Sequence, residues 1–130
     1  MKKVIVASTI VIMGIATASA APRDRETPPA ATPDGAAVSC IRTSDIRNQS
    51  YHGDSVIDFH MNNGKVYRNT LPMSCPNLGF EERILTKPTN GQLCSVDTIT
   101  VLQSPGLSQG ATCGLGKFQP VKITKIPKQG

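Results

Sequence analysis

Four cysteines, spread through a chain of 130 residues, restrict the kinds of fold that this sequence can adopt. No two of them form a CxxC pair, and neither histidine lies at zinc-ligand spacing from a cysteine. A structural zinc site and a redox-active dithiol are therefore not expected. In a small exported domain, an even number of cysteines indicates a disulfide framework. We predict two disulfides, each contributing about 2–4 kcal/mol to stability, among Cys40, Cys75, Cys94 and Cys113.

The spacing of the cysteines leaves three pairings open, and the intervening sequence favours one of them. Cys75 and Cys94 flank a stretch that is rich in turn-forming residues and poor in apolar ones, so an untied loop there would be mobile. Cys40 opens the first expected strand and Cys113 precedes the last, and the terminal strands of a small closed sheet are commonly neighbours. We therefore predict a Cys75–Cys94 bridge nested within a Cys40–Cys113 bridge.

The N-terminus has the features of an export signal. Lys2 and Lys3 precede an apolar run, and the small residues "ASA" that end at Ala20 match a signal-peptidase site. The run is shorter than the roughly 20 apolar residues that span a bilayer, and no cysteine near the cleavage site could carry a lipid. We expect a signal peptide over residues 1–20, no membrane anchor, and a periplasmic or secreted protein.

Residues 21–37 have the composition of a tether. They consist almost entirely of Ala, Pro, Thr, Gly and charged residues, which cannot bury enough apolar surface to offset the entropy lost on ordering. We expect a disordered linker there that is dispensable for folding. One small β domain should follow over residues 38–126, with a flexible tail over residues 127–130.

The domain shows the periodicity of strands rather than helices. No window carries apolar residues at helical spacing over several turns. The stretches "SVIDFHM", "VDTITVL" and "VKITKI" instead alternate or are rich in β-branched residues, and "CIRTSDIRN" is a weaker strand. "GFEERIL" fits either one helical turn or a strand. Short strands separated by Gly, Pro and Asn turns predict an all-β fold, a small disulfide-stapled barrel or sandwich.

The stretch "VIDFHMNNGKVYRN" predicts a hairpin whose loop length fixes its register. A two-residue turn would place Arg68 opposite Phe59 on the apolar face, where burying the charge is costly. A three-residue loop, with Gly64 in the left-handed conformation, instead pairs Phe59 with Tyr67. The same register pairs Asp58 with Arg68. We therefore expect the three-residue loop, with the aromatic pair toward the core and the ion pair toward solvent.

Asp58 and His60 are the strongest candidates for chemistry. They share a strand face, roughly 6–7 Å apart at about 3.3 Å per residue, so they could begin a metal site or an acid–base pair. Asp58 is expected to pair with Arg68, however, and an ion-paired carboxylate is a poor general base. His52 and Asp54 are assigned to the preceding turn. We expect no catalytic residue, no metal and no cofactor, and keep Asp58 and His60 as the alternative catalytic pair.

The formal charge of +5 is distributed unevenly, because no acidic residue follows Asp97. Four lysines do follow it, at positions 117, 122, 125 and 128. Such a basic stretch could face an anionic glycan, lipid or nucleic acid. Nucleic-acid sites interleave aromatic and basic residues, and only Phe118 occurs here. We expect no nucleic-acid binding and assign the lysines to a solvated strand face and tail.

The most distinctive motifs of the domain are "CIRTSDIR", "GKVYRNTLPMSCPNLGF", "LCSVDTITVL" and "TCGLGKFQPV". With these motifs, over about residues 40–121, the chain resembles a family of small exported proteins of Gram-negative proteobacteria that is known as a domain of unknown function. The resemblance implies periplasmic or secreted residence and implies no particular activity. Some relatives resemble lipoproteins, whereas this chain lacks the cysteine that would carry the lipid.

Two classes of function fit these features. The first is a non-enzymatic β module that binds a protein or an envelope component through residues 72–91 and 104–116, two loops that disulfides would hold rigid before contact. The alternative is a small hydrolase that acts on an envelope polymer through Asp58 and His60. The lack of a second convincing acid–base group counts against the hydrolase, so we expect a binding function.

Overall fold

The structure is a computed structural model, and it describes residue 14 and residues 27–124. The signal peptide expected at residues 1–20, apart from residue 14, lies outside the described residues. The tail expected at residues 127–130 also lies outside them.

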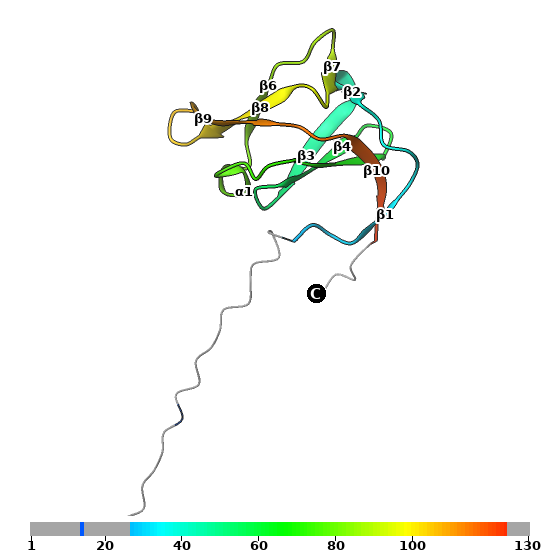
Figure 1. The fold of residues 1–130 in the computed structure, drawn as a ribbon, viewed down its shortest axis with the longest axis horizontal. Helices are drawn as coiled ribbons and strands as arrows, with labels where there is room; N and C mark the ends of the chain where they lie inside the picture. The colour runs from blue at the N-terminus through cyan, green and yellow to red at the C-terminus, as the bar shows by residue number, and fades with distance from the viewer. Residues whose placement is uncertain (1–13, 15–26, 125–130) are drawn as a thin grey trace, which may run out of the picture.

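The described residues form three antiparallel sheets (Figure 1). The largest has five strands, which are in order β1 (Ala31–Pro33), β10 (Phe118–Ile123), β5 (Val66–Thr70), β4 (Val56–Met61) and β3 (Ile46–His52). The second pairs β2 (Cys40–Arg42) with β7 (Gln92–Cys94). The third consists of β6 (Ile84–Thr86), β8 (Thr98–Gln103) and β9 (Ser108–Gly114). The all-β prediction is thus confirmed.

Two short helices connect these strands. The 3-10 helix η1 (Thr43–Asp45) links β2 to β3, and the single-turn helix α1 (Leu78–Glu81) precedes β6. Within the part of the chain that is described, no helix has the length and apolar character needed to cross a membrane.

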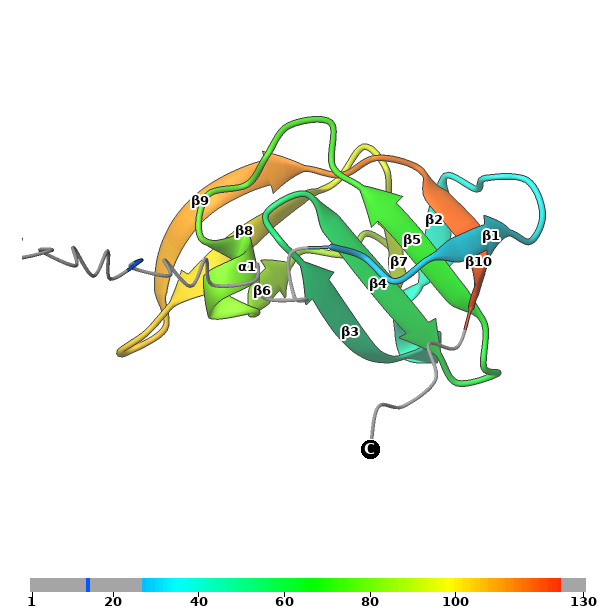
Figure 2. The ribbon, with the colours of Figure 1, turned by 90° about the horizontal axis from the view of Figure 1, so that it is seen from below.

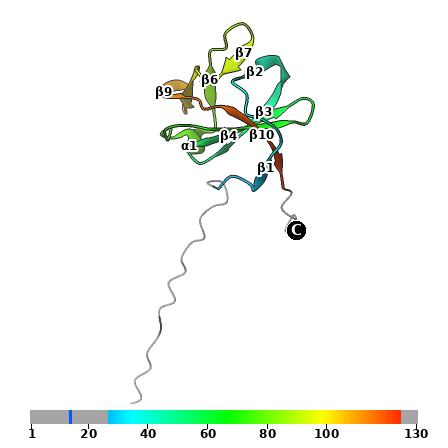
Figure 3. The same cartoon turned by 45° about the vertical axis from the view of Figure 1, so that its right-hand side comes forward.

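One hydrophobic core lies between the five-stranded sheet and the two smaller sheets, which face it in Figures 1 and 3. The inward-facing residues of β4 and β8 that alternation predicts are all buried: Ile57, Phe59, Met61, Ile99 and Val101. The rings of Phe59 and Phe118 meet edge to face, with centroids 5.5 Å apart and an interplanar angle of 65°. This geometry contributes about 0.5–1.5 kcal/mol beyond the burial of apolar area.

The hairpin between β4 and β5 has the predicted three-residue loop. Gly64 adopts a φ of +85°, in the left-handed region that favours glycine. In the ladder, Phe59 lies opposite Tyr67, and Asp58 lies opposite Arg68. The predicted register and both cross-strand pairs are confirmed.

The prediction that residues 21–37 form a disordered linker is wrong for the part that the structure describes. Ala31–Pro33 form β1, which pairs with β10, and the Asp34 amide donates a 2.8 Å hydrogen bond to the Pro120 carbonyl. Main-chain pairing requires no apolar side chain, and proline is tolerated because β1 is an edge strand. The folded unit therefore begins before residue 38.

The predicted nested disulfides are also wrong. Cys40–Cys94 joins directly opposed residues of β2 and β7, with a Cα–Cα distance of 4.0 Å. Cys75–Cys113 joins the segment after β5 to β9, with a Cα–Cα distance of 5.9 Å. The first strand, β1, does lie beside the last, β10, but Cys40 belongs to the second strand, whose partner is β7. The bridges span 54 and 38 residues, for which loop-closure entropy gives about 4 kcal/mol each.

Two segments expected to be loops contain regular structure. Residues 72–91 include α1 and β6, so "GFEERIL" divides between a helical turn and a strand. Residues 104–116 include β9, which pairs with β8. The small side chains and glycines of β9 give little hydrophobic signal, yet its main chain pairs like that of any other strand.

Asn69 connects β5 to the segment that follows β9. Its buried side-chain amide donates to the Gly116 carbonyl at 2.7 Å and accepts from the Gly116 amide at 2.8 Å. A Cβ atom at position 116 would collide with the Thr70 carbonyl oxygen, so this close approach requires glycine. Together with Cys75–Cys113, this contact joins the five-stranded and three-stranded sheets.

Candidate functional site

Asp58 and His60, the alternative catalytic pair, lie on the outer face of β4, which faces away from the core. Asp58 is nevertheless 0 % exposed. It is covered because the segment before β1 crosses the outer face of β5 and β4 (Figure 2). In that segment, the Pro29 carbonyl accepts a 2.9 Å hydrogen bond from Arg68 Nη2. The prediction that the Asp58–Arg68 pair faces solvent is therefore wrong.

Both oxygens of the Asp58 carboxylate are engaged. Arg68 donates from Nε to Oδ1 at 2.8 Å and from Nη2 to Oδ2 at 2.9 Å. His52 donates from Nε2 to Oδ2 at 3.1 Å. The hydrogen bond to Asp58 raises the pKa of Arg68 above its usual value, and paired bonds of this kind are among the strongest in proteins. The carboxylate thus anchors its neighbours and is not free to act as a base.

Sequence reasoning missed Ser50 and misplaced His52. His52 is the last residue of β3 rather than part of the turn, and Ser50 lies directly opposite Asp58. Ser50 Oγ and His60 Nε2 are hydrogen-bonded at 2.9 Å. Burial lowers the pKa of His60, and the nearby charge of Asp58 partly offsets this effect. Ser50 could not be found from sequence because the register of β3 against β4 was not known. In the observed register, alternate residues of β3, Ser50 among them, lie on the same face as His60.

These five residues, Ser50, His52, Asp58, His60 and Arg68, form what we call the outer-face cluster. A hydroxyl beside a neutral imidazole is the first part of a nucleophile–base arrangement. A complete arrangement also needs a group that orients the imidazole and donors for an oxyanion. Asp58 is held by Arg68 and His52 instead. Among the described residues, no group of three or more His, Cys, Asp or Glu side chains could hold a metal ion.

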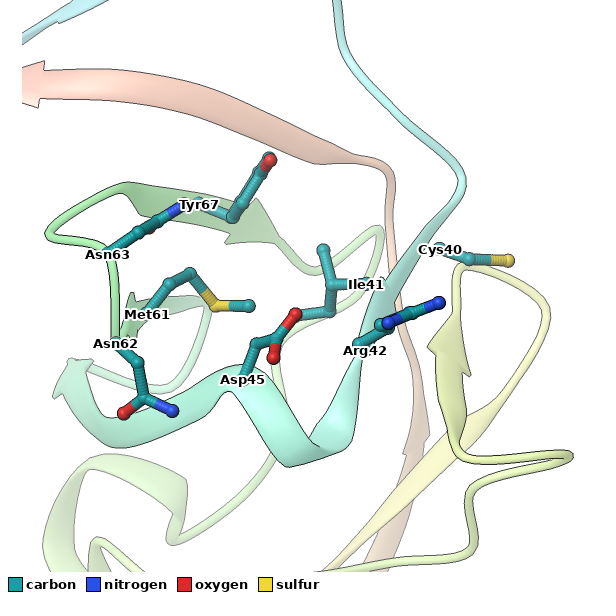
Figure 4. Close-up of a pocket in the computed structure, with 8 residues that line it drawn as sticks. All are labelled: Cys40, Ile41, Arg42, Asp45, Met61, Asn62, Asn63 and Tyr67. Atoms are coloured by element: carbon teal, nitrogen blue, oxygen red, sulfur yellow. The ribbon is translucent and has the colours of Figure 1, made fainter.

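A pocket of about 330 Å³ lies between η1 and the β4–β5 hairpin, apart from the outer-face cluster (Figure 4). We call it the hairpin pocket, and its lining residues are Cys40, Ile41, Arg42, Asp45, Met61, Asn62, Asn63 and Tyr67. Small-molecule sites typically measure about 300–1,000 Å³, so this pocket suits a small ligand.

The hairpin pocket combines an apolar floor with a polar rim. Ile41 and Met61 are each only 5 % exposed, and Figure 4 shows their side chains between η1, β2 and the hairpin. Tyr67 adds an aromatic side chain from β5. The rim carries two side chains of opposite charge, Arg42 and Asp45, and the amides of the hairpin loop.

Hydrogen bonds fix the walls of the hairpin pocket. The Asn62 amide donates to the Asp45 carbonyl at 2.8 Å, and Asn62 Nδ2 donates to the Ser44 carbonyl at 3.3 Å. These bonds tie the hairpin loop to η1. On the opposite side, the Cys40–Cys94 bridge holds β2 against β7. The pocket is therefore preformed, which lowers the entropy lost when a ligand binds.

Sequence reasoning missed this pocket because its residues come from five separate elements. They belong to β2, η1, β4, the hairpin loop and β5, and no short motif contains more than four of the eight. The polar stretch "RTSD" after a strand was a partial signal, but its position beside the hairpin depends on the pairing of β3 with β4. That pairing places η1 next to the hairpin loop.

The fold and pocket define a small, disulfide-linked all-β domain with a preformed polar site. The chain matches the Family of unknown function (DUF6491) over residues 1–129 and belongs to that family. No curated protein and no solved structure matches the chain.

Proposed function

We propose that this chain is a non-enzymatic binding module of a proteobacterial envelope, exported to the periplasm or secreted, that binds a protein or an envelope component. The observation that carries the proposal is the hairpin pocket, with its apolar floor, its charged rim and its fixed walls. Two disulfides support residence in an oxidising compartment. The N-terminal apolar run supports export.

Capture from an envelope extract tests this function. The oxidised chain, immobilised through its C-terminus, is compared with an Arg42→Ala variant, which alters the pocket rim. Lys122→Ala is the matched control, because Lys122 is an exposed cation on β10 and is not part of the pocket. The proposal predicts a component that the parent chain and the control retain and that Arg42→Ala loses. Equal capture by all three chains would exclude the pocket as the binding site.

A hydrolase is the second candidate, favoured by the 2.9 Å hydrogen bond between Ser50 and His60. In that mechanism, His60 would accept the proton of Ser50 as the hydroxyl attacks an ester or amide of an envelope polymer. Release of soluble fragments from purified envelope polymer provides the assay. Turnover that disappears in both Ser50→Ala and His60→Gln would establish the hydrolase and refute the non-enzymatic function. We expect no turnover by the parent chain.

A further inference from the structure

We infer that the hairpin pocket binds a small zwitterion, a free amino acid or dipeptide that carries an apolar side chain. This inference rests on the proposed binding function and specifies its ligand. Asp45 and Arg42 provide charges of opposite sign in one pocket of about 330 Å³. Among the described residues, neither of them belongs to an ion pair. Both charges therefore remain available to a ligand.

The two charges together select against simple ions. A lone anion would be attracted by Arg42 but repelled by Asp45. A lone cation would be attracted by Asp45 but repelled by Arg42. A ligand with an ammonium group beside Asp45 and a carboxylate beside Arg42 satisfies both at once. Arg42 ends β2 and Asp45 ends η1, three positions further along the chain, and both line the same pocket (Figure 4), so one small ligand that carries both groups can reach both residues. Amino acids and dipeptides have this property.

The floor specifies the remainder of the ligand. Ile41 and Met61 are buried beneath the pocket, and Tyr67 borders it. An apolar ligand side chain directed toward the hairpin would cover this surface, and thioether and aromatic groups adapt well to such contacts. The volume lies at the lower end of the range for ligand sites, which favours an amino acid or dipeptide over a polymer segment.

The test uses three probes and two pocket variants. The ¹⁵N-labelled oxidised chain is titrated with leucyl-leucine, with its N-acetylated form, which lacks the ammonium group, and with its amidated form, which lacks the carboxylate. Arg42→Gln and Asp45→Asn remove one protein charge each. Arg42→Lys keeps the charge, and Lys122→Gln is the control outside the pocket. Amide shifts give the dissociation constant and the location of binding.

We expect Arg42→Gln to weaken binding of leucyl-leucine and of its N-acetylated form about two- to fivefold, the range for an exposed ion pair. It should leave binding of the amidated form unchanged. Asp45→Asn should weaken leucyl-leucine and the amidated form by a similar factor and spare the N-acetylated form. Arg42→Lys should retain most of the affinity, and Lys122→Gln all of it.

Uniform responses of the three probes to both variants would overturn the inference, as would shifts that lie outside the pocket or the absence of any shift. Its failure is distinguishable from failure of the binding function. If no probe binds but Arg42→Ala still loses the captured envelope component, only the ligand class is wrong. If the pocket variants change neither measurement, both proposals fall.

Discussion

Replacing Arg68 with Met tests the burial of the outer-face cluster. Methionine fills a similar volume but removes the two hydrogen bonds of 2.8 and 2.9 Å to Asp58 and the bond to Pro29. The Asp58 carboxylate, which is 0 % exposed, would then keep only its contact with His52. A buried charge that loses its principal partner is strongly destabilising.

The structure sets the expected size of this loss. Removing one partner of a buried ion pair costs about 3–5 kcal/mol. The Arg68 side chain is 16 % exposed, so water partly screens the pair and we expect about 3 kcal/mol. A small domain has about 5–15 kcal/mol of stability, so the variant should fold. Its melting temperature should fall by about 12 °C or more, at about 4–8 °C per kcal/mol.

Urea denaturation of the oxidised chain, followed by circular dichroism, measures this loss. Arg47→Met is the matched control, because Arg47 is exposed on the neighbouring strand β3 and should cost less than about 0.5 kcal/mol. Adding Asp58→Asn to Arg68→Met removes the uncompensated charge and should recover part of the stability. A cost below about 1 kcal/mol for Arg68→Met, the value for a surface pair, would refute the burial of Asp58.

Three further predictions follow from the fold. Deleting residues 1–33 should lower the melting temperature by several degrees and increase hydrogen exchange in β10, because β1 and the Pro29 contact are lost; an unchanged stability would show that the segment contributes nothing. Phe59→Ala should cost about 3–5 kcal/mol, as measured by denaturation, because the side chain is fully buried; a cost near 1 kcal/mol would contradict its place in the core. Burial lowers the pKa of His60, so its contribution to stability is present above pH about 6.5 and is lost as the pH falls through the lowered value. His60→Gln should flatten the stability profile as the pH falls below about 6.5, and an identical profile in both chains would exclude this role.

The hairpin could be predicted from sequence because its determinants are local. Alternation along β4 and the cost of burying Arg68 opposite Phe59 were sufficient to choose the loop length and the register. The same reasoning wrongly predicted that Asp58 faces solvent. Asp58 is buried because a segment far away in the chain, which includes Pro29, lies over it. That cover uses the carbonyl of Pro29, and side-chain hydrophobicity contains no information about such a contact.

The disulfides and the hairpin pocket depend on long-range topology. Cys40 and Cys94 become neighbours only because β2 pairs with β7, two three-residue strands with weak patterns. The pocket likewise requires η1 to lie beside the hairpin loop, through the bond from Asn62 to Asp45. Composition and periodicity define strands and their faces, but they do not define which short strands meet.

The central claim, that the hairpin pocket is the binding site, is tested most directly by mapping an unselected ligand on the protein. The ¹⁵N-labelled oxidised chain is titrated with the low-molecular-mass fraction of an envelope extract, and the amide shifts are plotted by residue. We predict that the shifts cluster at residues 40–45, 61–63 and 67. Shifts centred instead on Ser50 and His60, or no saturable shift at any residue, would contradict the claim.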